Sequence, residues 1–285
     1  MKNQDVVSCI DGSTFTEAVC EYSSWIANGI NAPLKFLHTV EQSNAPSVTD
    51  LSGSIGLGAS EDLLNELAQV EQNQSHLLIK KGNLMLQAAK QKAEDAGVSN
   101  ITLRQQKGGL AESLVEIEDQ IRAVVIGIRG TDHNSEQSGL GAQLETVIRS
   151  LHKPILVVNK SFSIPKKIML AYDGSTGSKK ALDIVASSPL FKSTPCHLVH
   201  VGDQASASES LLKEAENVLT AAGINATTTR LKGKAEDKLA AYQAEQDIDL
   251  TIMGAFSHTR VRGFILGSFT AKMLQKTHRP LLLLR

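Results

Sequence analysis

The sequence has few aromatic residues, few cysteines and no excess of either charge. Aromatic residues make up 4% of the 285 residues, and the formal net charge is -1. A stacking platform for single strands and a basic nucleic-acid-binding surface are therefore not expected. The cysteines Cys9, Cys20 and Cys196 lack the spacing of metal ligands, and we interpret Cys9 and Cys20 as buried small residues. No apolar run suits a signal peptide or a membrane span, so we expect a cytoplasmic protein with no nucleic-acid partner.

Several signatures of enzymes are also missing. The phosphate-binding pattern Gly-x4-Gly-Lys-[Ser/Thr] is absent, as is the Ser-Gly-Gly-x-Asp-Ser pattern of ATP pyrophosphatases. No serine or cysteine has an evident partner base, and the recurring His38 and His200 suit packed, hydrogen-bonded side chains better than catalytic ones. We predict no catalytic residue, no certain metal site and at most a weak ATPase.

Short apolar segments recur in the same order in the two halves of the chain. The matched pairs are Val6–Ser13 with Ile168–Ser175, Leu37–Val40 with Val199–Val201, Val124–Gly127 with Thr251–Gly254, and Lys153–Val158 with Arg279–Leu284. This period is too long for a solenoid and suits a duplicated domain. We predict domains at 1–159 and 160–285, joined by a short polar linker that ends at Pro165.

Apolar runs alternate with helical patterns within each half. In the second half the runs cover 167–172, 197–201, 227–231, 250–254 and 280–285. Strands that are buried on both faces and alternate with helices are typical of parallel sheets. The sequence thus predicts an α/β fold with two tandem, open parallel sheets and helices on both faces. In such a fold, ligands bind at the carboxyl ends of the strands, where the strand order reverses.

One insertion of 35 residues distinguishes the first half, and it follows the second strand at about 42–80. Residues 42–58 are rich in Ser, Gly, Asn and Pro and predict a loop. Residues 60–80 have the apolar spacing of an amphipathic helix. The insertion is interpreted as a surface elaboration, with a lid or a partner surface as alternatives.

A phosphate-binding loop is predicted after the strand at 250–254. The strand leads into Gly254-Ala255-Phe256-Ser257, and Gly267-Ser268-Phe269-Thr270 opens the next helix. Backbone N–H groups and the helix dipole at such a start attract anions. Gly267 permits close approach of the backbone, and Ser268 and Thr270 add hydroxyl donors. The alternative is that the glycines serve only turns and that the basic residues between them are solvated.

Two motifs together resemble the universal stress protein family over essentially the whole chain. They are Asp-Gly-Ser after the first strand of each half and Gly-x2-[Gly/Ser]-x9-Gly-Ser after the fourth strand. The resemblance implies a five-stranded, Rossmann-like parallel sheet in the order 3-2-1-4-5 in each half. It also implies ATP in the crevice between strands one and four. Antiparallel pairing of the fifth strands would give an intramolecular pseudo-dimer, and a homodimer of chains is a further expectation.

The second half keeps most of the family's nucleotide-binding pattern. The resemblance carries over to Asp173, Val201, Gly254, Gly267 and Ser268, and the predicted nucleotide-binding set further includes Met253, Ser257, His258, Arg262, Phe269 and Thr270. Ser257 replaces the second glycine of the family pattern, which is unfavourable if that position needs a positive φ. Asp173 could accept a hydrogen bond from ribose or adenine, or join a Mg²⁺ shell with phosphate oxygens. A turn-forming role is the alternative for Asp173.

The first half departs further from the pattern. Its degenerate site comprises Asp11, Gly127, Gly130 and Gly141, with ten residues rather than nine before Gly141, and Ala142 in place of Ser or Thr. For Asp11 we favour the turn-forming role. Charged residues give a formal -1 to the first loop and, through Arg260 and Arg262, +2 to the second. A triphosphate is therefore expected to bind mainly in the second half.

Three functions remain open on the sequence alone. The first is a stress-response regulatory module that binds ATP, with or without Mg²⁺. The second is a slow ATP hydrolase. The third is an interaction protein whose pockets are empty or hold an apolar ligand, with the 42–80 insertion as a docking surface.

Overall fold

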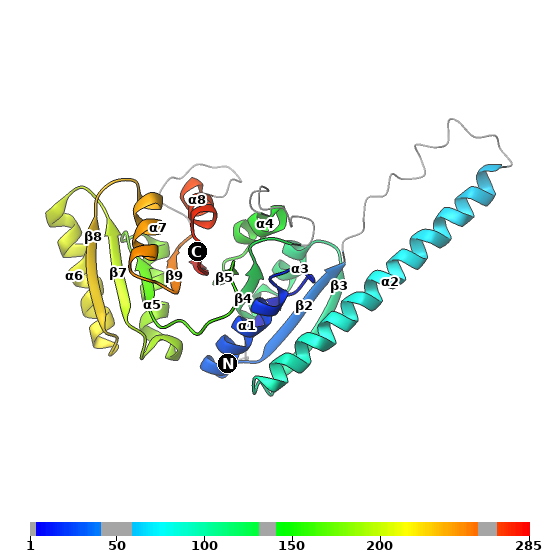
Figure 1. The fold of residues 1–285 in the computed structure, drawn as a ribbon, viewed down its shortest axis with the longest axis horizontal. Helices are drawn as coiled ribbons and strands as arrows, with labels where there is room; N and C mark the ends of the chain where they lie inside the picture. The colour runs from blue at the N-terminus through cyan, green and yellow to red at the C-terminus, as the bar shows by residue number, and fades with distance from the viewer. Residues whose placement is uncertain (1–3, 41–58, 131–140, 256–266) are drawn as a thin grey trace.

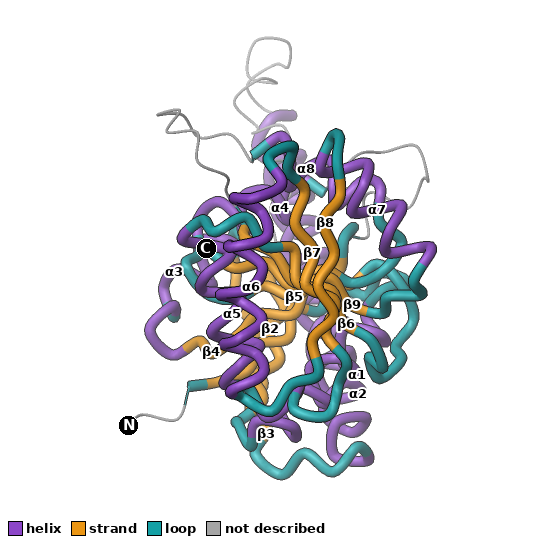
Figure 2. The backbone as a smooth tube through the Cα atoms, turned by 90° about the vertical axis from the view of Figure 1, so that its left-hand side faces the viewer, coloured by secondary structure: helices purple, strands orange, loops and turns teal. Residues whose placement is uncertain are grey.

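The structure is a computed structural model, and it describes residues 4–40, 59–130, 141–255 and 267–285. A single ten-stranded sheet runs through the described part, with helices on both of its faces (Figures 1 and 2). None of the described helices combines the length and the apolar character needed to cross a membrane.

Five strands come from each half of the chain, and strands and α-helices follow in the same order in both halves; only the short 3-10 helices η2 and η4 stand at different places. The elements of the first half are β1 (Asp5–Cys9), α1 (Thr16–Ile30), β2 (Leu34–Val40), α2 (Ala59–Asp95), β3 (Ile101–Lys107), α3 (Leu110–Glu116), η2 (Glu118–Gln120), β4 (Ile121–Gly127), α4 (Ala142–Ser150) and β5 (Ile155–Val158). Those of the second half are β6 (Ile168–Ala171), α5 (Thr176–Ser187), η4 (Pro189–Phe191), β7 (Cys196–Val201), α6 (Ala205–Ala221), β8 (Ala226–Leu231), α7 (Ala235–Glu245), β9 (Leu250–Gly254), α8 (Ser268–Lys276) and β10 (Leu281–Leu284).

The strand order confirms the predicted fold class. The sheet reads β3-β2-β1-β4-β5-β10-β9-β6-β7-β8, so each half has the order 3-2-1-4-5 and all pairs within a half are parallel. The two half-sheets are continuous, because β5 and β10 pair antiparallel with Leu282 opposite Leu156. Both strands are apolar and uncharged, and this pairing covers edges that would otherwise invite association.

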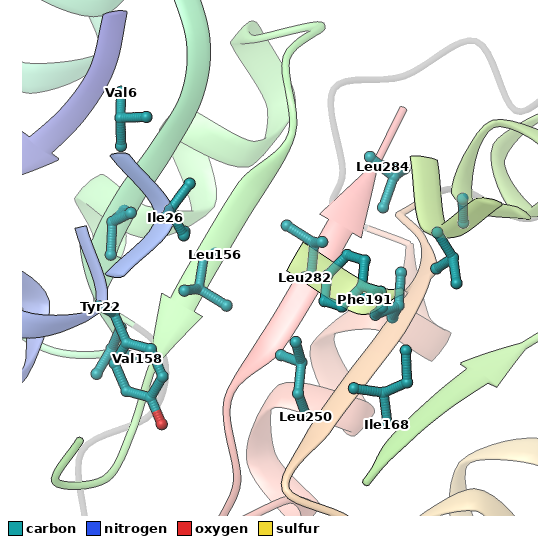
Figure 3. Packing of buried hydrophobic residues seen from close by; sticks show 14 of the residues in the cluster. Val6, Tyr22, Ile26, Leu156, Val158, Ile168, Phe191, Leu250, Leu282 and Leu284 are labelled. Carbon is teal, nitrogen blue, oxygen red and sulfur yellow. The ribbon is translucent and has the colours of Figure 1, made fainter. Parts of the chain in front are cut away.

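The core lies in two layers, and each layer draws residues from both halves. Buried side chains of α1, α2, α5 and α6 pack on one face of the sheet, and those of α3, α4, α7 and α8 pack on the other. Figure 3 shows the first layer where the halves meet, with Leu156 and Val158 on β5 and Leu282 and Leu284 on β10.

The linker between the halves is fixed to the first of them. The ring of Phe162 packs edge-on against Tyr22 of α1, with 4.8 Å between ring centroids. The Tyr22 hydroxyl donates to the carbonyl of Ser163 at 3.4 Å. Two further hydrogen bonds cross between the halves: Asn159 Nδ2 donates to the Thr277 carbonyl at 2.9 Å, and Arg285 Nη1 donates to the Arg149 carbonyl. These contacts join the halves beyond the pairing of β5 with β10.

The insertion in the first half lengthens a helix rather than adding a separate one. A helix is predicted at 60–80, but α2 runs without interruption from Ala59 to Asp95. Its later part carries Leu86, Ala89 and Ala93, which are buried against the sheet. Its earlier part extends past the sheet, as the long helix in Figure 1. The predicted loop 42–58 lies outside the described residues.

Candidate functional site

The predicted second crevice lies where β6 and β9 run side by side. These strands pair in parallel, with Ala171 opposite Met253, so both carboxyl ends face the same edge of the sheet. Asp173 follows β6, Gly254 ends β9, and α8 starts at Ser268. In the sheet β6 lies between β7 and β9, so the strand order reverses at β6. Such a switch point is where open α/β sheets bind ligands.

The first turn of α8 is suited to an anion. Its N-cap is Gly267, with φ -53 and ψ 131, and no side chain in the described part of the chain caps the helix. The first turn holds no acidic residue, and Ser268 is exposed. Backbone N–H groups and the positive end of the helix dipole therefore face this edge without an opposing carboxylate on the helix.

Thr270 has a different task from the one predicted for it. Its side chain is buried, and its hydroxyl donates to the carbonyl of Ala255, directly after β9. The bond ties the start of α8 to the end of the strand. Of the two predicted hydroxyl donors, Ser268 is the exposed one.

Two glycines let the start of α5 approach the end of β9. A Cβ on Gly254 would lie 3.0 Å from the carbonyl carbon of Gly177 and 3.1 Å from the nitrogen of Ser178. Both neighbours are backbone atoms, which cannot rotate aside. Gly254 is therefore required by packing at this edge, whether or not a ligand binds there.

Both aspartates hold the turns that follow their strands. Asp173 Oδ1 accepts from the Ser175 N–H at 2.9 Å, and Asp11 Oδ1 accepts from the Ser13 N–H at 2.9 Å. Asp11 also accepts from the Thr16 hydroxyl at 3.2 Å. Asp173 is exposed, whereas Asp11 is partly buried. The turn-forming role applies to both residues, and a ligand at Asp173 would share its carboxylate with that turn.

The remaining predicted positions divide into core, surface and undescribed residues. The side chain of Met253 is fully buried in the core, whereas Val201 and Phe269 are partly buried and pack against it. Only the backbone of Met253 can therefore line a crevice. Ser257, His258 and Arg262 lie outside the described residues, as do Arg260 and the charges predicted in the first loop, Asp132 and Glu136.

The predicted first crevice has the same arrangement of strands and helix start as the second, but different side chains. Helix α4 follows Gly141, whose φ of -58 and ψ of 130 match those of Gly267. Its first turn carries Glu145, where α8 has Ala271. Phe15 stands where the second half has Gly177, and a Cβ on Gly127 would lie 3.0 Å from the Phe15 Cβ. A Cβ on Gly130 would lie 3.1 Å from Asp11 Oδ2, so the start of this loop lies directly beside the Asp11 carboxylate.

Sequence reasoning missed Phe15 and Glu145. Both become visible when the halves are aligned residue by residue from Asp11 and Asp173, and from Gly141 and Gly267.

The buried histidine and cysteines are structural. His38 Nδ1 donates to the Ile10 carbonyl at 2.8 Å, and His200 Nδ1 makes the same bond to Tyr172 at 2.8 Å. Cys9, Cys20 and Cys196 are free and buried. Burial raises the pKa of Cys20 and of Cys196 to about 12, so these groups stay as thiols rather than nucleophilic thiolates. Among the described residues, no group of His, Cys, Asp and Glu side chains is arranged to hold a metal ion.

Comparisons with known proteins agree on one family. The model described as "Universal stress protein family" matches residues 2–159 and 202–285. A universal stress protein of Synechocystis sp. is 36% identical over 289 residues, which cover 100% of both chains. Among solved structures, a universal stress protein from Archaeoglobus fulgidus DSM 4304 matches with a TM-score of 0.73 and 17% identity, covering 100% of this chain and 97% of its own. A putative universal stress protein from Pseudomonas aeruginosa UCBPP-PA14 matches with a TM-score of 0.63 and 15% identity, covering 99% and 92%.

Proposed function

Because the chain belongs to the universal stress protein family, we propose that it is a cytoplasmic stress-response regulator that binds ATP mainly in its second half. The observation that carries this proposal is the start of α8. A helix N-terminus without a side-chain cap or a first-turn acid stands at the switch point, beside an exposed Ser268 and the end of β9. A phosphate group would accept hydrogen bonds there from the backbone and from the hydroxyl.

Electrostatics favour the second half over the first. In α4 the carboxylate of Glu145 stands in the first helical turn, where it repels an anion, and α8 has alanine at that position. The loop before α8 adds Arg260 and Arg262, whereas the loop before α4 carries a formal -1. A triphosphate would thus be attracted by one loop and repelled by the other. Mg²⁺, where present, would be held mainly by phosphate oxygens, with Asp173 as the protein ligand at hand.

We further propose that the two halves, 1–159 and 160–285, act as an internal pseudo-dimer. The halves are joined by the pairing of β5 with β10 and by the hydrogen bonds from Asn159 and Arg285. A ligand at the start of α8 could affect the first half through these contacts. ATP would act by binding one arrangement of the halves better than another, since only a difference in affinity shifts an equilibrium.

Calorimetric titration with Mg-ATP tests this proposal through matched glycine variants. Among the described residues, a Cβ on Gly267 would lie no closer than 3.8 Å to another atom, and a Cβ on Gly141 no closer than 3.7 Å, so we expect the fold to tolerate a side chain at both positions. We expect Gly267→Val to weaken ATP binding by about tenfold or more, because it blocks close approach of a phosphate to the backbone. Gly141→Val is the control and should leave the affinity unchanged.

Other outcomes would contradict the proposal or favour its alternatives. Unchanged tight binding in Gly267→Val would remove the α8 start from the site, and loss of binding in Gly141→Val would move the site to the first half. Phosphate release that disappears in Asp173→Ala would support a slow ATP hydrolase. Native mass spectrometry that finds an apolar molecule and no nucleotide on the purified protein would favour an interaction protein.

A further inference from the structure

Helix α2 leaves the sheet at a defined point. The side chain of Gln105 on β3 donates to the helix carbonyl of Ile79 at 3.2 Å. Gly82 packs directly against the side chains of His38 and Gln105, which a larger residue would have to displace. Before this point in the sequence, from Asn65 to Leu78, most residues are exposed, and the helix projects beyond the carboxyl edge of the sheet (Figure 1).

A second apolar stripe runs along α2, away from the face that packs on the sheet. The buried positions on the sheet side are Gly82, Leu86, Ala89 and Ala93. The second stripe, which we call the outer seam, consists of Leu67, Val70, Gln74, Leu77, Lys81, Leu84 and Ala88. Its steps alternate between three and four residues, which is the heptad spacing of a coiled coil.

The large apolar side chains of the outer seam are exposed, and their exposure does not stabilise a monomer. Leu77 and Leu84 are each 64% exposed and Val70 is 51% exposed. From Leu67 to Ala88 the seam covers three heptads, a span of about 32 Å at the rise of an α-helix. Three heptads are the least that supports a coiled-coil assignment. Gln74 and Lys81 are the polar positions, and such residues in a seam select a particular register and partner.

Charge along the described part of α2 favours one orientation of a partner helix. Glu66 and Glu71 lie toward its start, and Lys80 and Lys81 lie toward its middle. In a parallel pair of identical helices, like charges would meet. In an antiparallel pair about a point near residue 75, the glutamates of each helix would lie beside the lysines of the other.

One apolar surface that could join two copies is already paired inside the chain. The apolar strands β5 and β10 pair with each other inside the chain. We propose that the outer seam of α2 is a homodimer interface, in which two copies of the chain pair antiparallel through this helix. The proposal is independent of nucleotide binding, since it uses no residue of the crevice.

Sedimentation equilibrium of the full chain tests the interface. We expect a dimer in the micromolar range for the natural sequence, and a rise in its dissociation constant of about a hundredfold or more in the double variant Leu77→Glu and Leu84→Glu. Both leucines are mostly exposed, so the fold and ATP binding should not change. The matched control is Gln72→Glu and Asn83→Glu, which adds the same charge to exposed positions of α2 off the seam, and it should remain dimeric.

Charge reversal tests the orientation. In the antiparallel dimer, Lys80→Glu with Lys81→Glu should weaken association by about tenfold, and adding Glu66→Lys and Glu71→Lys should restore it. A dimer that is indifferent to the lysine reversal would overturn the antiparallel arrangement. A natural chain that stays monomeric through the micromolar range, or a dimer that survives Leu77→Glu and Leu84→Glu, would overturn the interface itself; the first result would mean that another partner or the chain's own segment covers the seam.

Discussion

The two crevices share one frame but differ in how a helix start meets a strand end. In the second half, Gly177 and Gly254 bring the backbone of α5 against that of β9. In the first half, Phe15 takes the place of Gly177 and lies between the start of α1 and Gly127. The two halves thus share the strand order but differ in packing at the edge of the sheet where a ligand is proposed to bind. A conserved sheet does not by itself preserve a site.

The largest expected effect comes from adding a side chain at the contact between Gly177 and Gly254 in the second half. Gly254→Ala would set a Cβ 3.0 Å from backbone atoms of α5, and we expect it to lower the free energy of unfolding by about 3 kcal/mol, at the upper end for overpacking. Urea denaturation measures this. Gly127→Ala is the matched change in the first half, where the new methyl meets the Phe15 side chain first, and its cost should be about 1 kcal/mol. Equal costs in the two variants would mean that the crevices are packed alike.

An intermediate effect is expected from removing the aromatic ring of Phe15. The ring is partly buried and packs against both core layers, so Phe15→Ala should cost about 2 kcal/mol, less than for a fully buried phenylalanine. Thermal or urea unfolding checks the stability. The same variant separates two reasons for the proposed lack of ATP binding in the first half. If charge is the reason, the first half of Phe15→Ala still fails to bind ATP in a titration; if the ring is the reason, a second binding event appears.

The fold could be predicted because its signals are local and repeated. The apolar run at 250–254 coincides with β9, and the other predicted strands of the second half differ from the observed ones by one or two residues. The continuity of α2 was not predicted, because the expected helix ended with the insertion at residue 80. Residues 59–95 contain no proline, and Gly82 is a packing residue rather than a helix end, so the helix runs on.

The site was less predictable, since its residues depend on side-chain partners. A sequence pattern shows that Thr270 carries a hydroxyl but not that this hydroxyl donates to Ala255. Likewise, it shows Met253 next to the motif but not that the side chain points into the core. The contact between Gly177 and Gly254 joins residues 77 positions apart and needs the parallel pairing of β6 with β9 to arise.

The smallest expected effect concerns the second strand of each half: the first half has an ion pair where the second half has a histidine. In the first half Lys35 Nζ lies 2.6 Å from Asp5 Oδ2. The matching residues of the second half are His197 and Lys167, and His197 Nδ1 lies 2.9 Å from the hydroxyl of Tyr242. Desolvation, and to a smaller degree the charge of Lys167, lower the pKa of His197 below its usual value near 6.5.

Acid should therefore destabilise the protein through His197. Above pH 6.5 the imidazole is neutral in both states; as the pH falls below that value, the unfolded chain binds the proton first, and stability is lost until the lower folded pKa is reached. After discounting for solvent screening, we expect a loss of less than about 1 kcal/mol between about pH 8 and pH 5. Urea unfolding of the natural chain and of His197→Gln at both pH values isolates this part, because the other histidines contribute equally to each. Since the charge of Lys167 also lowers the pKa of His197, Lys167→Gln should reduce the loss of stability between the two pH values. A pH dependence of stability that is the same in the natural chain and in His197→Gln would show that His197 contributes nothing to it.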